Sequence, residues 1–190
     1  DFLNKLLANY HFSLIFTIFC FGVLVNGCNF IDGLNGLLIG YSILIFLSLL
    51  LQSEIRLFNI HDFGFIYLFT CALILLFVFN IFGLIFLGDN GSYVLSTILG
   101  LYLLDFFINN QILSPYYIAV LLWYPAFENL YSLIRRIKLK QNVSEADNTH
   151  LHHFIYMYFK EKVFVNKKYA NSLTSSIILT FNFPSFIIAN

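Results

Sequence analysis

The sequence predicts an all-α protein, a polytopic membrane bundle with about six transmembrane helices. Of its 190 residues, 59% are hydrophobic and only 11% are charged, whereas a soluble domain of this length carries about a quarter charged residues. Long stretches without a formal charge alternate with short polar segments, as in helices that cross a bilayer and are joined by loops. We therefore expect residues 1–190 to form a single integral membrane domain without a nucleic-acid partner.

Six apolar runs account for the expected helices. They are Phe12–Val25, Leu34–Leu51, Phe63–Leu87, Tyr93–Ile108, Ile112–Phe127 and Leu173–Ala189. The first needs flanking residues to reach the ~20 of a membrane span, and the third includes a turn around Asn80 and Gly83. Pro115 and Pro125 lie near the ends of the fifth run, where proline disturbs a helix least. The chain begins at Asp1 rather than Met, so we expect a fragment without its amino-terminal helices.

The first polar segment, Asn26–Gly36, separates two of these runs. Asn26, Asn29, Asp32 and Asn35 follow one another at three-residue intervals, a spacing that would align their side chains along one face of a helix. The alternative is a plain turn between helices, since Asp-Gly and Asn-Gly steps are typical of turns. A functional site is favoured, because polar groups at membrane depth are costly unless they serve a purpose.

The second polar segment, Gly88–Ser92, centres on Asp89. Mg²⁺ is commonly bound by one or two carboxylates together with substrate phosphates, so Asp89 is a candidate ligand. The neighbouring glycines would let backbone amides approach phosphate oxygens at the start of the next helix. The alternative is a helix cap made by Asp89 or Ser92.

Residues 131–170 are predicted to form a cytoplasmic loop with an amphipathic helix and a histidine motif. Apolar residues recur at helical spacing from Phe127 to Ile137, while basic side chains occupy the other faces. This pattern is typical of a helix that lies at a membrane surface.

The third polar segment, Ala146–His153, contains three of the five histidines. His150 and His153 share a helical face, and His152 points elsewhere. Histidines close to Arg135 and Arg136 suit the binding of a diphosphate. Zinc binding is a lesser alternative, because the segment lacks a His-Glu-x-x-His motif, and a solvated loop is another.

Charge distribution predicts the orientation in the membrane. Eight of the ten Lys and Arg residues lie between Arg135 and Lys168, and such clusters face the cytoplasm. Alternating the spans then places all three polar segments on that same side. The opposite loops, Gln52–Asp62 and Asn109–Ser114, together contain only Arg56 as a basic residue. We expect a multi-pass protein of the inner (plasma) membrane whose active site faces the cytoplasm.

Four motifs taken together resemble the polyprenyl-phosphate N-acetylhexosamine-1-phosphate transferases, in particular the branch that uses UDP-GlcNAc and undecaprenyl phosphate. They are Asn26-x-x-Asn29-x-x-Asp32-Gly33-Leu34-Asn35-Gly36, Phe86-Leu87-Gly88-Asp89-Asn90-Gly91-Ser92, Pro125-x-x-Glu128 with Arg135-Arg136, and Asp147-x-x-His150-Leu151-His152-His153. The family is related to phospho-MurNAc-pentapeptide transferase. The resemblance implies transfer of a sugar-1-phosphate from a UDP-sugar to a membrane polyprenyl phosphate, with release of UMP, in cell-envelope polysaccharide or glycolipid biosynthesis.

The resemblance also implies roles for individual residues. Catalytic roles fall to Asp32, Asp89 and His153, with Asp89 as the ligand of Mg²⁺ or alternatively Mn²⁺. Substrate-binding roles fall to Asn26, Asn29, Asn35, Arg135, Arg136, His150 and His152. Asn35 stands where many members have a second Asp, and an aspartate pair of the family would lie upstream of residue 1. The implied partners are a UDP-sugar, a polyprenyl phosphate lipid and the membrane, with a homodimer left open.

Two other classes of protein stay open. A membrane transporter would use Asp32, Asp89 and Asp105 along a substrate path, but it predicts charges near the membrane centre and inverted repeats. The acidic residues of the first two polar segments lie at span ends, and no repeat is evident. A non-catalytic membrane protein that binds partners through residues 131–170 is the other alternative. Asp105 has no assigned role.

Overall fold

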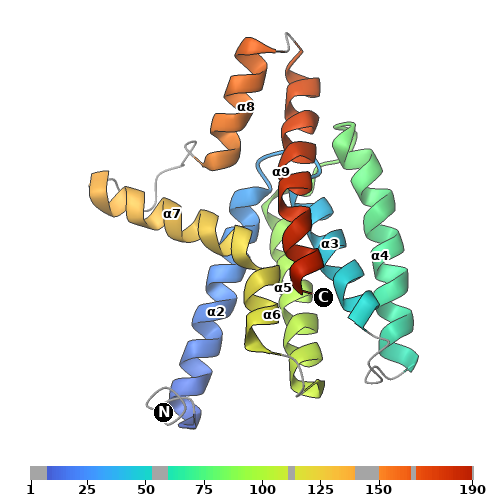
Figure 1. Cartoon of the computed structure of the whole chain (residues 1–190), viewed down its shortest axis with the longest axis vertical. Coiled ribbons are helices and arrows are strands. Elements are labelled where there is room, and N and C mark those ends of the chain that lie inside the picture. The colour runs from blue at the N-terminus through green and yellow to red at the C-terminus, as the bar shows by residue number, and fades with distance from the viewer. Residues whose placement is uncertain (1–7, 53–59, 111–113, 140–149, 164–165, 190) are drawn as a thin grey trace.

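The computed structural model describes residues 8–52, 60–110, 114–139, 150–163 and 166–189 (Figure 1). All regular structure within these ranges is helical, which confirms the predicted fold class. The helices are α2 (Tyr10–Ile31), α3 (Leu37–Gln52), α4 (Ile60–Ile81), α5 (Gly88–Asn109), α6 (Pro115–Leu121), α7 (Trp123–Leu139), α8 (Leu151–Lys162) and α9 (Lys167–Ala189). Parts of the predicted outer loops, residues 53–59 and 111–113, lie outside the described residues.

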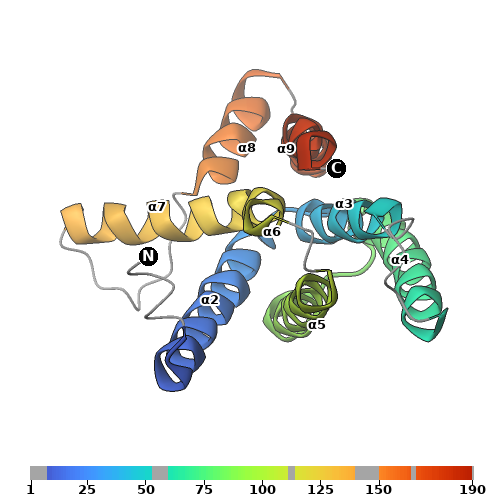
Figure 2. The same ribbon diagram turned by 60° about the horizontal axis from the view of Figure 1, so that its bottom comes forward.

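Within the described residues, three stretches are by length and composition apolar enough to cross a membrane, and this agrees with a membrane protein. They are Tyr10–Ile31, Gly64–Ile81 and Gly88–Asn109, and the shorter stretch Leu37–Leu51 in α3 is also apolar. The helix α3 lies among α4, α5 and α9 (Figure 2) and contacts all three. Its side chains are buried on nearly every side, as Leu37, Tyr41 and Phe46 illustrate. A helix that is apolar all round is expected at the centre of a bundle.

The predicted fifth span, Ile112–Phe127, is wrong as one continuous helix. The described part of this run breaks after Leu121, and α7 then runs crosswise to α2 (Figures 1 and 2). Pro125 supplies the physical reason, because it has no N–H to donate to the carbonyl of Leu121 four residues earlier. That carbonyl instead accepts the hydroxyl of Tyr41 at 2.9 Å. The break therefore leaves no unpaired carbonyl at this position.

The predicted amphipathic helix is present in α7, and its polar face is the one that packs against the protein. Glu128, Ser132 and Arg136 are buried, whereas the apolar side chains at intervening positions are exposed. The exposed apolar set comprises Phe127, Leu130, Tyr131, Ile134 and Ile137. Such a helix presents its apolar surface away from the bundle, as expected of one lying against lipid.

The crossing of α2 and α7 depends on a close backbone contact. A Cβ atom added to Gly27 would overlap the carbonyl group of Pro125, lying 2.8 Å from its carbon. Beside this contact, the side-chain amide of Asn129 donates to the carbonyl of Val23 at 3.0 Å. Glycine is thus required at position 27 so that α7 can lie directly on α2.

Candidate active site

The first polar segment divides between a helix and a turn. The helix α2 continues to Ile31, and Asp32 is its C-cap residue. The predicted single helical face for Asn26, Asn29, Asp32 and Asn35 is therefore wrong, because helical geometry ends before Asp32. Only two of the four side chains lie on the helix.

The turn after α2 is held by residues from distant helices. Gly36 has φ of 81°, in the left-handed region that favours glycine, and its N–H donates to the side-chain oxygen of Asn80 on α4. The N–H of Asn35 donates to the side-chain oxygen of Asn171 on α9 at 2.7 Å. These bonds fix the backbone that carries Asp32.

The second polar segment forms the first turn of α5 and is not a loop before it. Gly88 begins the helix with φ of 63°, and Asp89 lies in its first turn. No side chain caps this helix in the described structure, so the alternative interpretation of Asp89 or Ser92 as a helix cap is wrong. The hydroxyl of Ser92 instead donates to the side-chain oxygen of Asn29 at 2.7 Å. This bond ties the start of α5 to the end of α2.

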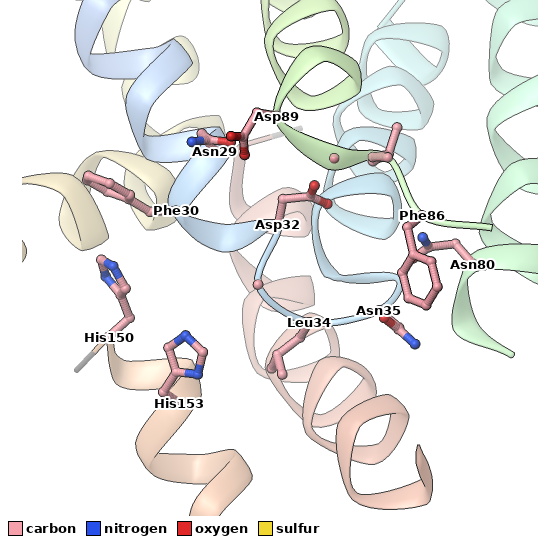
Figure 3. A pocket seen from close by; sticks show the side chains of 13 residues that line it. Asn29, Phe30, Asp32, Leu34, Asn35, Asn80, Phe86, Asp89, His150 and His153 are labelled. Carbon is pink, nitrogen blue, oxygen red and sulfur yellow. The ribbon is translucent and has the colours of Figure 1, made fainter. Parts of the chain in front are cut away.

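The three polar segments meet at a cavity of about 380 Å³ (Figure 3). Its lining comprises Asn29, Phe30, Asp32, Gly33, Leu34, Asn35, Asn80, Phe86, Leu87, Gly88, Asp89, His150 and His153. The prediction that these segments lie on one face of the membrane bundle agrees with this arrangement. Six of the predicted site residues line the cavity, namely Asn29, Asn35, Asp32, Asp89, His150 and His153.

Other predicted site residues lie elsewhere. Asn26 is exposed on α2 and does not line this cavity. Arg135 is partly buried and Arg136 buried on α7, and neither lines the cavity. His152 is fully buried and does not line the cavity. The prediction that it points away from His150 and His153 is wrong, because its ring lies 5.3 Å from that of His150 and 4.5 Å from that of His153. Asp147 lies outside the described residues.

The acidic side of the cavity consists of Asp32 and Asp89, whose side chains are both directed into it (Figure 3). Burial raises the pKa of Asp32 to about 7, and the neighbouring carboxylate of Asp89 adds to the rise. A cation between the two groups would relieve this repulsion. No cluster of three or more His, Cys, Asp or Glu side chains in the described ranges has the arrangement of a metal site. Two carboxylates that leave room for phosphate oxygens nevertheless fit the usual donor set of Mg²⁺.

The histidine side of the cavity is supported from behind by Glu128 on α7. Its Oε1 atom lies 3.3 Å from Nδ1 of His152 and accepts the hydroxyl of Tyr124 at 3.1 Å. Its Oε2 atom lies 3.4 Å from Nδ1 of His150, at ion-pair distance. Burial would raise the pKa of Glu128, but the two imidazoles outweigh burial and hold it well below the usual range. The side chain is therefore a carboxylate at neutral pH.

Sequence reasoning assigned no role to Glu128 or Asn80. Both carry a visible signal, because Glu128 is an acidic residue in a largely apolar stretch and Asn80 interrupts a long apolar run. A buried polar residue needs a hydrogen-bond partner, which suggests that each of the two binds a group from another part of the chain. The identity of that partner could not be read from the sequence.

Comparisons with known proteins agree on the kind of protein this chain is similar to. The family model described as glycosyl transferase family 4 matches residues 2–107. An undecaprenyl-phosphate α-N-acetylglucosaminyl 1-phosphate transferase of Thermotoga maritima is 31% identical over 140 residues, which is 73% of this chain and 42% of the relative. A probable undecaprenyl-phosphate N-acetylglucosaminyl 1-phosphate transferase of Bacillus subtilis is 32% identical over 137 residues, or 68% of this chain and 37% of the relative. The chain therefore spans less than half the length of these relatives. No solved structure matches significantly.

Proposed function

Because this chain belongs to glycosyl transferase family 4, we propose that it is part of a membrane sugar-phosphate transferase. It transfers N-acetylhexosamine-1-phosphate from a UDP-sugar to a polyprenyl phosphate and releases UMP. The observation that supports this most directly is the cavity at the ends of α2 and α5. It combines two carboxylates with two imidazoles, and those groups suit a metal-bound diphosphate.

The reaction is a phosphoryl transfer in which an oxygen of the lipid phosphate attacks the phosphorus attached to the sugar. The bond from that phosphorus to the oxygen of UMP breaks, and UMP leaves with the bonding electrons. Asp89, with Asp32 beside it, would hold Mg²⁺, which offsets negative charge on the diphosphate. The protein has little covalent chemistry to perform, so positioning and electrostatic stabilisation dominate.

The histidines supply the other contacts to the donor substrate. His150 and His153 line the cavity together with the two carboxylates, so their ring N–H groups can donate to diphosphate oxygens. Asn29 and Asn35 add amide groups to the same lining. The side-chain oxygen of Asn29 already accepts the hydroxyl of Ser92, which orients its amide relative to Asp89.

The lipid substrate requires an apolar surface within reach of this site. A second cavity, of about 570 Å³, lies among α2, α5, α6 and α7 and is lined almost entirely by apolar side chains, including Leu24, Gly100 and Leu103. Gly100 and Asp89 are both on α5, roughly 16 Å apart along the helix axis at 1.5 Å per residue. An isoprenoid chain that occupies this second cavity and extends along α5 would have to cover roughly that distance to place its phosphate beside Asp89.

The site is proposed to face the cytoplasm at the inner (plasma) membrane. Support comes from the basic residues Lys160 and Lys162 at the end of α8, because α8 begins at the site and basic segments stay inside. A transporter is not favoured: Asp105 is exposed on α5 and accepts a hydrogen bond from Asn109 at 3.1 Å. It does not line the cavity with Asp32 and Asp89.

The proposal is tested by UMP release from the full-length protein in detergent, supplied with polyprenyl phosphate, Mg²⁺ and a panel of UDP-sugars. We expect release that requires both the lipid and the metal, and the active donor identifies the sugar. Asp89→Asn should abolish turnover while leaving membrane insertion intact. Asp105→Asn, an exposed aspartate on the same helix, is the matched control and should retain activity. Absence of release from folded wild-type protein with every donor would refute the proposal.

A further inference from the structure

The carboxylate of Glu128 is the most deeply buried acidic group in the described part of the chain. Its side chain is 0% exposed, on a helix whose other face carries exposed apolar residues. A buried charge is costly unless paired groups compensate it. Here the compensation comes from the imidazoles of His150 and His152 and from the hydroxyl of Tyr124.

The two imidazoles are held in a fixed arrangement around this carboxylate. Their rings lie 5.3 Å apart with an angle of 3° between planes, so they are parallel. Phe30 of α2 packs against the outer ring, that of His150, at 4.8 Å. His150 is also the N-cap residue of α8, and its carbonyl accepts the N–H of His153 at 3.0 Å. Each imidazole therefore presents Nδ1 to a different oxygen of the same carboxylate.

This arrangement determines where the imidazole protons lie. An ionised carboxylate can only accept hydrogen bonds, so Nδ1 of His152, 3.3 Å from Oε1, carries the hydrogen of that bond. Nδ1 of His150 lies 3.4 Å from Oε2 without hydrogen-bond geometry, and the negative oxygen beside it favours hydrogen on this nitrogen as well. Their Nε2 atoms then point away from Glu128. His150 lines the cavity, while Nε2 of His152 is buried without a hydrogen-bond partner in the described structure. That atom faces Gly33, where an added Cβ would come within 2.9 Å of it.

We propose that Glu128 is a positioning residue that holds His150 and His152 with Nδ1 protonated, so that Nε2 of His152 faces Gly33 in the Asp32–Gly36 turn and the ring of His150 lines the cavity. The consequence for catalysis rests on the proposed function: Nε2 of His150 is the ring nitrogen left to meet the donor diphosphate, and it donates to a phosphate oxygen when the bound ring carries hydrogen on both nitrogens. Glu128 itself does not line the cavity, so it acts through the histidines.

The position of the protons can be measured without substrate. In full-length protein labelled with ¹⁵N-histidine, nuclear magnetic resonance distinguishes a protonated ring nitrogen from an unprotonated one. The signals are assigned by His150→Gln and His152→Gln. We expect hydrogen on Nδ1 of both residues in the wild type. A neutral ring with hydrogen only on Nε2, in either residue, would overturn the proposal.

The variant Glu128→Gln tests the role of the carboxylate. Its amide has one oxygen that can accept from one Nδ1–H and one NH₂ group that must donate to the other ring. One of the two histidines should therefore move its proton to Nε2. Glu161→Gln, an exposed glutamate on α8, is the matched control and should leave both rings unchanged. Unchanged histidine signals in folded Glu128→Gln would contradict the proposal.

Activity gives a second readout. By analogy with carboxylates that orient metal-binding imidazoles, we expect Glu128→Gln to lower kcat/KM for the UDP-sugar by about 10- to 100-fold. The KM for the lipid should stay unchanged, since the apolar cavity does not include Glu128. An equal loss of kcat/KM for the UDP-sugar and for the lipid would indicate a merely structural role for Glu128. It would overturn the proposed effect of Glu128 on the donor diphosphate. If the wild type releases no UMP, the proposed function fails, whereas the resonance experiment still decides the proton positions.

Discussion

Replacing Gly27 with Ala should separate α2 from α7 and disturb the site from a distance. The added Cβ would overlap the carbonyl group of Pro125, lying 2.8 Å from its carbon. Backbone atoms cannot rotate out of the way as a side chain can, so the helices must move apart. Glu128 lies one turn beyond Pro125 on α7, and it moves with that helix.

The size of the effect follows from the geometry. Restoring ordinary contact requires a shift on the order of 1 Å, and overpacking of this kind costs about 1–3 kcal/mol. Alanine also gains up to about 1 kcal/mol over glycine in a helix. Gly22 lies on the same helix with nothing within 4 Å of its added Cβ. Gly22→Ala therefore has the higher helix propensity of alanine without a steric overlap. Gly27→Ala should therefore be less stable than Gly22→Ala by about 1–3 kcal/mol.

The free energy of unfolding is measured for both variants by titration with sodium dodecyl sulfate in mixed micelles. The protein has a single Trp, Trp123 at the start of α7, so its fluorescence reports on the displaced helix. UMP release is measured in parallel, and a misplacement near 1 Å can lower it by about 100-fold. Equal stability of the two variants would refute the argument that α7 rests directly on Gly27.

Three further predictions concern the cavities. Gly33→Ala should lower UMP release without preventing membrane insertion, because its Cβ would lie 2.9 Å from Nε2 of His152; activity equal to wild type would show that the turn can shift freely. Asp32 has a pKa raised to about 7 in the folded state by burial and by a neighbouring carboxylate, so metal-free protein should lose stability as pH rises from about 4 to about 7. The melting temperature of the wild type should fall across this pH range, whereas that of Asp32→Asn should change little. An equal slope of melting temperature against pH in both proteins would contradict the raised pKa of Asp32. Cys20 lines the apolar cavity, so polyprenyl phosphate should slow its reaction with an apolar maleimide in detergent. The reaction rate of exposed Cys71 should not change when the lipid is added; an unchanged rate at Cys20 as well would argue against lipid in this cavity.

The membrane class and the helical fold could be predicted from composition alone, because burial in lipid demands long apolar runs. The convergence of the three polar segments also followed from the sequence, since alternating spans leave few arrangements of loops. Helix ends were less predictable. The first polar segment continues α2 as far as Ile31, and the second is already part of α5, because local polarity does not determine whether a residue starts a helix or precedes it.

The sequence by itself determined that Asp32, Asp89 and the histidines belong near one end of the bundle, since they follow or precede apolar spans of similar length. Only the tertiary structure decided which side chains reach the cavity. It left Asn26 exposed on α2 and placed the carboxylate of Glu128 beside the Nδ1 atoms of both His150 and His152. These outcomes depend on how α7 crosses α2 over Gly27, which is a contact between segments about a hundred residues apart. Hydropathy and spacing describe neighbours along the chain, whereas a buried charge is compensated by whichever groups packing brings to it.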